Sequence, residues 1–141
     1  MFDLNKLLID VFDPQSGELV AVVVDEPTDA VPDHDGWRAR REMAEEWRKA
    51  LTKLGAERGF DVRPLVSFPA TGGNNADLPA TGTMGGQEID RGEGLSDSTL
   101  VLAMTEFSAT APLVHVAEAA EDFRAASMPG VEKRMEGTAL A

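Results

Sequence analysis

Residues 18–25 read Glu-Leu-Val-Ala-Val-Val-Val-Asp, and this stretch decides the fold class. Its apolar run is continuous and does not alternate with polar residues, as expected for a strand that is covered on both faces. Strands of this kind occur in parallel sheets that have helices packed on each side. Pro27 ends the run two residues after Asp25. The stretch therefore predicts one strand of a parallel α/β sheet.

A helix is expected both before and after this strand. Residues 3–12 carry leucines at helical spacing, and Asp3 can cap the N-terminus of that helix. Residues 36–57 form the longest predicted helix, which Gly55 or Gly59 can end. One face of this helix is charged, and its buried stripe consists of Ala44, Trp47, Leu51 and Leu54, extended by Trp37.

The remaining chain continues the alternation of strands and helices. The predicted strands span residues 60–68, 99–107 and 122–126, and the predicted helices span residues 110–120 and 131–140. Pro64 within the first of these strands favours an edge position or a bulge. Residues 69–98 are Gly-rich and poor in apolar residues, which predicts a long loop that is either functional or disordered.

This order of elements predicts a doubly wound, Rossmann-like α/β fold, with a mostly parallel sheet of about four strands and helices on both faces. The 141 residues suffice for a single domain, spanning 1–141. Because the last predicted helix is followed by no strand, we expect the chain to be the N-terminal part of a larger protein. A natural C-terminal helix is the alternative.

Composition narrows the classes of partner. The chain has 25 acidic and 13 basic residues, a formal net charge of −12, which disfavours binding to nucleic acid or to a membrane surface. It has no cysteine, which excludes disulfides, thiolate zinc sites and cysteine nucleophiles. No apolar run spans a membrane and no basic leader precedes the first helix, so we expect a cytoplasmic protein. The acidic excess fits either a high-salt cytoplasm or an ordinary solubilising surface.

Candidate ligand-binding residues follow from the predicted sheet, because ligands of open α/β sheets bind at the carboxyl ends of the strands. Ser108 or Thr110 would cap the helix after the third strand, and free N–H groups there could hold an anion; a plain helix cap is the alternative. Arg124 or Ser127 near this turn would favour anion binding. The full set of candidates is Asp25, Glu106, Ser108, Thr110, Arg124 and Ser127.

Several other chemistries lack their motifs. The Gly-rich segment contains no phosphate-binding loop, and a calcium loop around Asp33 fails because Val31 occupies its first ligand position. The two histidines, His34 and His115, lack the carboxylate spacing of a metal site. His115 also lies too far along the predicted helix to activate Ser108 in a serine triad. The sequence therefore predicts no complete catalytic site and no cofactor in this chain.

Several short motifs, which are spread over most of the chain, resemble those of one group of proteins. They are Val24-Asp25-Glu26-Pro27, Trp37-Arg38-x-Arg40-Arg41, Ser108-Ala109-Thr110-Ala111-Pro112-Leu113, and Arg124-Ala125-Ala126-Ser127-Met128-Pro129-Gly130 followed by Met135 and Ala139-Leu140. The chain resembles the N-terminal part of the aminopeptidase T-like superfamily, which includes leucyl aminopeptidases and thermophilic metallopeptidases.

The resemblance implies a non-catalytic role for this chain. In such proteins the N-terminal domain is α/β, and a dinuclear metal site built from Glu, His and Asp lies in the C-terminal domain. No matching ligands occur here, so divalent metal is expected only in a C-terminal catalytic domain outside this chain. The implied role is to shape a substrate cavity or to support a homo-oligomer. Two alternatives from the residues alone are a free-standing module that binds a small anionic metabolite at the 105–110 turn, and an interaction protein with a mobile 69–98 loop.

Overall fold

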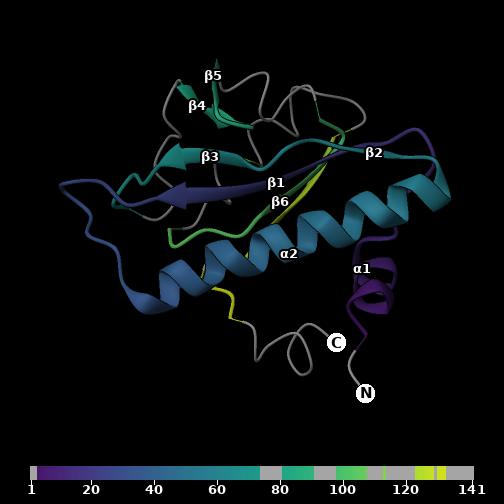
Figure 1. The fold of residues 1–141 in the computed structure, drawn as a ribbon, viewed down its shortest axis with the longest axis horizontal. Helices are drawn as coiled ribbons and strands as arrows, with labels where there is room; N and C mark the ends of the chain where they lie inside the picture. Colours follow the sequence, from purple (N-terminus) through teal and green to yellow (C-terminus); the bar gives the residue numbers. More distant parts are fainter. Residues whose placement is uncertain are drawn as a thin grey trace.

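The computed structural model describes residues 3–73, 81–90, 98–107, 113, 123–128 and 130–132. Within these residues the chain forms a layer of helix packed on a twisted sheet (Figure 1). The elements are α1 (Leu4–Phe12), β1 (Leu19–Glu26), α2 (Asp35–Arg58), β2 (Asp61–Val62), β3 (Val66–Pro69), β4 (Thr81–Met84), β5 (Gln87–Asp90), β6 (Leu100–Ala103) and β7 (Arg124–Ser127).

The first three elements match the predictions from the sequence to within one residue at each end. Asp3 caps α1 by accepting a hydrogen bond from the backbone N–H of Lys6. Helix α2 ends at Gly59, whose φ of 86° lies in the left-handed region that glycine adopts without strain. The sequence locates these elements well because the apolar pattern and the capping residues indicate the same boundaries.

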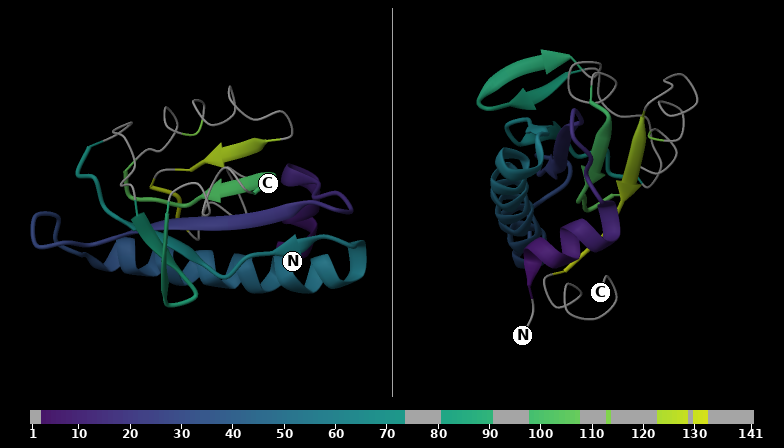
Figure 2. Two further views of the ribbon diagram at one scale, coloured as in Figure 1. Left: turned by 90° about the horizontal axis from the view of Figure 1, so that it is seen from above. Right: turned by 90° about the vertical axis from the view of Figure 1, so that its right-hand side faces the viewer.

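Strand β1 is the centre of a seven-stranded mixed sheet with the order β5-β4-β3-β1-β6-β7, and β2 also pairs with β1. The pairs that β1 makes with β2, β3 and β6 are parallel, as is the pair of β6 with β7. The β3–β4 and β4–β5 pairs are antiparallel. Figure 2 shows the β4–β5 hairpin at one end of the sheet and β7 at the other.

The predicted doubly wound, mostly parallel sheet of about four strands is therefore wrong. The sheet is mixed and has seven strands, and α1 and α2 both pack on the same face. Two strands were not predicted because they lie within the expected Gly-rich loop. A third arises because the expected strand over residues 60–68 is divided into β2 and β3.

Pro64 causes that division. Val20 of β1 pairs with Val62, whereas Val23 pairs with Val66, so two residues of β1 face three residues of the partner strand. Proline has no N–H group to donate to a neighbouring strand. At a bulge, one extra residue is left unpaired, so the strand can accommodate Pro64 and then resume pairing. The sequence favours an edge position or a bulge at Pro64, and the register fits the bulge.

The β4–β5 hairpin turns through Gly85 and Gly86, which have φ values of 60° and 83°. Two positive φ values in a two-residue loop define a type I′ turn, whose twist matches that of the flanking strands. Met84 and Gln87 pair directly across the turn. The hairpin is thus specified by its turn and by the burial of Ile89, beside which Met84 is partly buried, because the other residues of both strands are polar or small.

The Gly86→Ala variant is expected to lose about 1 kcal/mol of unfolding free energy, because alanine is strained at positive φ. A Cβ atom at this position would meet nothing within 4 Å, so the effect is conformational and not steric. Gly86→Asn is the control, since asparagine tolerates this region and should cost clearly less. Urea denaturation of both variants measures the difference; equal losses would contradict the turn assignment.

The apolar core lies on both faces of the sheet. On one face, even-numbered residues of β1 and residues of β6 pack against α1 and α2; this cluster includes Leu8, Phe12, Val20, Val22, Val24, Trp47, Leu51, Leu100 and Leu102. On the other face, Ala21, Val23, Phe68 and Val101 pack with Ile89 and Leu113. Burial on both faces explains why the β1 run is continuously apolar.

None of the helices in the described ranges combines the length and the apolar character needed to cross a membrane.

Candidate functional site

The carboxyl ends of β1 and β6 mark the topological switch point of the sheet. From β1 the chain passes through α2 to β3 on one side, and it later returns to β6 on the other side. Ligands of open α/β sheets bind at such a point. Five polar or aromatic residues, which we call the switch-point cluster, meet here: Asp25, His34, Trp37, Arg40 and Glu106.

Asp25 anchors the cluster. Its side chain is buried, and its Oδ1 accepts hydrogen bonds from the backbone N–H of Glu106 at 2.8 Å and from Trp37 Nε1 at 3.0 Å. Its Oδ2 accepts a hydrogen bond from the backbone N–H of Phe107 at 3.1 Å. Two successive backbone N–H groups and an indole N–H thus surround the carboxylate, an arrangement that holds anions in many proteins. In this chain the anion is the chain's own side chain.

The Trp37 ring is fixed by its neighbours as well as by Asp25. The guanidinium of Arg41 lies 5.6 Å from the ring centroid, and the Phe107 ring meets it edge-on at 6.3 Å. Arg41 is itself held by a bidentate pair with Asp33, with N–O distances of 3.0 and 2.8 Å. These contacts join the first turns of α2 to the loop after β6.

Arg40 links three segments of the chain. Its side chain is only 5% exposed, its Nη1 donates to Glu106 Oε1 at 2.5 Å, and its Nε donates to the carbonyl oxygen of Val131 at 2.6 Å. Burying a guanidinium is costly unless it is paired and hydrogen-bonded, and here both conditions hold. Arg40 therefore ties α2 to the loop after β6 and to the segment after β7.

Glu106 is also bonded to His34 through its second carboxylate oxygen. Burial alone would raise the pKa of Glu106, but hydrogen bonds from His34 and Arg40, with the charge of Arg40, hold it below its ordinary value. Asp33 behaves similarly: hydrogen bonding from Arg41 lowers its pKa to about 2 against the cost of desolvation. Both carboxylates are thus ionised near neutral pH.

These shifts predict a loss of stability in acid. A carboxyl group with a lowered folded pKa binds fewer protons in the folded chain, so it contributes stability above its unfolded pKa. That contribution is lost as the pH falls through the folded pKa. We expect the unfolding free energy to fall between about pH 4.5 and pH 2, through the ion pairs of Glu18, Asp33, Glu45 and Glu106.

Denaturant titrations at several pH values measure this effect, in salt that screens the general repulsion of an acidic chain. Asp33→Asn is the matched variant, because it removes the carboxyl group whose pKa is lowered to about 2 and should flatten the profile towards pH 2. A wild-type stability that stays constant from pH 5 to pH 2 would contradict the assignment.

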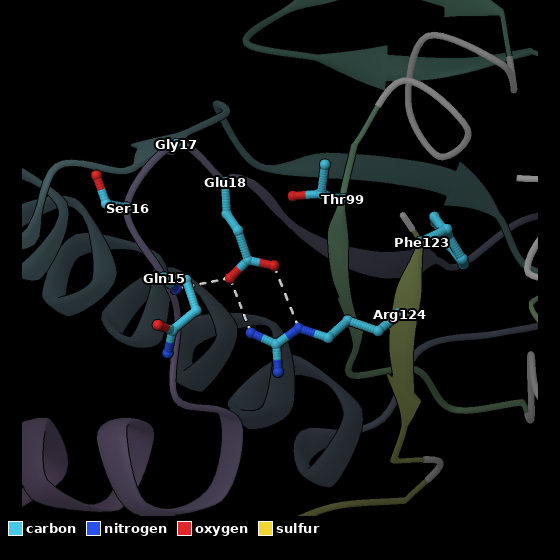
Figure 3. A pocket seen from close by; sticks show the side chains of 7 residues that line it. All are labelled: Gln15, Ser16, Gly17, Glu18, Thr99, Phe123 and Arg124. Carbon is cyan, nitrogen blue, oxygen red and sulfur yellow. Dashed lines mark hydrogen bonds and ion pairs between the residues drawn. The ribbon is translucent and has the colours of Figure 1, made fainter. Parts of the chain in front are cut away.

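Arg124 lies at the opposite, amino-terminal edge of the sheet. There it lines an open cleft of about 520 Å³, bordered by Gln15, Ser16, Gly17, Glu18, Thr99, Phe123 and Arg124 (Figure 3). Its guanidinium donates to both carboxylate oxygens of Glu18, and to the carbonyl oxygens of Phe12 and Asp13 at 2.5 and 3.1 Å. Arg124 thus binds the last carbonyl groups of α1, where a cation is favourable.

The structure brings together only some of the residues predicted from the sequence. Asp25 and Glu106 meet at the switch point, and Ser127 pairs in register with Ala103 at the same edge of the sheet. Arg124 does not reach this edge. Ser108 and Thr110 lie outside the described residues, as does most of the predicted helix over residues 110–120.

Three members of the cluster, His34, Trp37 and Arg40, were not among the predicted site residues. Arg40 lies three residues after Trp37 and four before Ala44, so helical spacing alone puts it on the buried stripe. A charged residue on an apolar stripe was the available signal, since such a residue needs a buried partner. His34 was harder to identify from the sequence. Histidine is not among the preferred N-cap residues, so its position before α2 does not by itself predict that its side chain caps the helix.

The hydrogen bonds of the switch-point cluster are arranged to stabilise the edge of the sheet and not to transfer a proton. Asp25 accepts three hydrogen bonds and Glu106 is bonded to the side chains of Arg40 and His34, so neither carboxylate is placed to act as a general base. In the described ranges, no three His, Cys, Asp or Glu side chains are grouped to hold a metal ion. The arrangement fits a rigid support.

Comparisons with protein-family models, with curated proteins and with solved structures found no match to this chain.

Proposed function

We propose that this chain is the non-catalytic N-terminal domain of a metal-dependent, aminopeptidase-like hydrolase of the cytoplasm. In that role it would shape the substrate cavity or support a homo-oligomer, while a C-terminal domain would supply the divalent metal and the reaction. The proposal rests on the resemblance of its motifs and on where the described parts of those motifs lie.

The proposal rests on one structural observation: the described segments that carry these motifs are hydrogen-bonded to one another at one edge of the sheet. Asp25 belongs to the first motif and bonds Trp37 of the second. Gly130 of the last motif donates its N–H to the carbonyl oxygen of Thr105, at 2.8 Å, and Arg40 of the second bonds the next residue, Val131. Segments separated by about a hundred residues are thus bonded together at one edge of the sheet, as expected if that edge supports an adjoining catalytic domain.

The test is to isolate the protein from its native cells and to measure its intact mass, its metal content and its aminopeptidase activity together. We expect a species larger than 15.1 kDa, or a complex, that carries zinc or cobalt and cleaves leucine p-nitroanilide until a chelator is added. The isolated 141-residue chain should show no peptidase activity and no stoichiometric metal binding at micromolar concentration. A native species of 15.1 kDa without metal or activity would overturn the proposal.

A free-standing module that binds a small anion is the second candidate. It is favoured by the position of the cluster at a topological switch point and by the two successive N–H groups of Glu106 and Phe107. Against it, Asp25 occupies those N–H groups and Glu106 neutralises Arg40. Calorimetric titration with phosphate and with succinate distinguishes the two: the first proposal expects no binding below millimolar concentration.

A further inference from the structure

His34 makes two side-chain contacts that link separate segments. As the N-cap of α2, its ring Nδ1 accepts a hydrogen bond from the backbone N–H of Trp37 at 3.2 Å. Its Nε2 bonds Glu106, in the loop after β6. The His34 side chain is about half exposed, so solvent protons reach it directly.

The two contacts together are compatible with only one protonation state and one tautomer of the imidazole ring. A neutral imidazole has one N–H donor and one acceptor nitrogen. Because Nδ1 accepts from Trp37, the proton of the neutral ring lies on Nε2, which donates it to Glu106. A protonated ring has two donors, so its Nδ1–H would oppose the N–H of Trp37. Protonation is therefore incompatible with the helix cap but compatible with the Glu106 contact, which becomes a charge-assisted hydrogen bond.

The surroundings of His34 contain both signs of charge. Glu106 contacts the ring and Asp33 accepts the backbone N–H of His34 at 2.9 Å. The nearby charged side chains are Asp33, Asp35 and Glu106, and the guanidinium groups of Arg38, Arg40 and Arg41 that pair with them. Histidine is the side chain that ordinarily changes charge between pH 5 and pH 8.

We propose that His34 is a pH-responsive clasp between the first turn of α2 and the loop after β6. The neutral ring holds both segments. The protonated ring holds only Glu106 and releases the backbone N–H of Trp37. Because the Trp37 indole is bonded to Asp25, release loosens the edge at which Asp25 and the N–H groups of Glu106 and Phe107 meet. This inference does not depend on the proposed hydrolase role.

The experiment is amide hydrogen exchange followed by ¹H–¹⁵N NMR on the full chain from pH 8 to pH 5, with rates corrected for intrinsic exchange. The protection factor of the Trp37 amide should fall about fivefold as the pH decreases, the loss expected for removing one N-cap. The indole N–H of Trp37 should shift over the same range, while the indole of the fully buried Trp47 stays constant. A Trp37 amide whose protection is independent of pH in the wild type would overturn the proposal.

Two variants separate the contacts. His34→Asn keeps a permanent acceptor at the cap, so Trp37 protection should stay high at every pH. His34→Gln can reach Glu106 without capping the helix, so protection should be low at every pH. His115 is unchanged in both variants, and any titration that it causes will persist in them. A pH dependence in His34→Asn equal to that of the wild type would also overturn the proposal.

Discussion

The Asp25→Ala variant is expected to lose about 3–5 kcal/mol of unfolding free energy. The substitution removes the acceptor of three hydrogen bonds and leaves the backbone N–H groups of Glu106 and Phe107 facing an apolar methyl group, whereas Trp37 Nε1 keeps its bond to the carbonyl oxygen of residue 25 at 3.1 Å. Each buried donor without a partner costs desolvation free energy, and water reaches this site poorly because Asp25 is only 7% exposed. Chemical denaturation with fluorescence detection measures the loss.

Two further measurements show whether the carboxylate itself is responsible. Asp25→Asn keeps an oxygen acceptor of the same size, so it should lose clearly less than the alanine variant. Formate should restore part of the stability of Asp25→Ala in a concentration-dependent manner, because the vacated N–H groups favour a small anion. A loss below about 1 kcal/mol for Asp25→Ala, with no effect of formate, would show that these hydrogen bonds do not support the fold.

Rescue by formate would also clarify why the switch point lacks an open anion site. Its backbone N–H groups are arranged as in an anion site, but the chain's own carboxylate occupies them. Arg40, the buried cation nearby, is likewise bonded to Glu106. An edge that binds its own charges has no free charge to offer an anion, which favours the proposed supporting role over the anion-binding alternative.

The sequence predicts the helices and strands whose apolar pattern and flanking residues indicate the same boundaries. It does not predict boundaries that depend on contacts between residues far apart in the chain. The continuous run of β1 and the apolar stripe of α2 are long enough to outweigh any competing pattern, and both were located to within one residue. The strand expected over residues 99–107 is shorter, because residues 104–107 turn to meet Asp25. Asp25 lies about eighty residues earlier, so no local pattern contains that contact.

The β4–β5 hairpin was missed for a different reason. Its strands contain only two large apolar residues, Met84 and Ile89, so neither alternation nor composition marks them, and the segment reads as a loop. The available signal was the Gly85-Gly86 pair between two short runs, which is typical of a type I′ turn. The sheet is mixed because β4 pairs antiparallel with both β3 and β5.

The Trp47→Ala variant is expected to lose about 3–5 kcal/mol, the cost of removing a large aromatic side chain from a packed core. Trp47 is fully buried on α2, where its ring lies 6.1 Å from that of Phe12 and joins α1 to the sheet. Since Phe12 at the end of α1 packs against this ring, loss of Trp47 should also reduce the amide protection of α1 more than that of β1.

Trp47→Phe distinguishes the contribution of the ring's packing to stability from the contribution of its indole N–H group. Trp47 Nε1 is buried and makes no hydrogen bond to the described residues, so replacing the indole removes a donor that already lacks a partner. The smaller phenyl ring leaves a gap, which opposes that gain. We therefore expect Trp47→Phe to lie within about 1.5 kcal/mol of the wild type by urea denaturation. If Trp47→Phe instead loses as much as Trp47→Ala, the indole N–H has a partner in solution, and the contact between α1 and α2 depends on that hydrogen bond more than on packing.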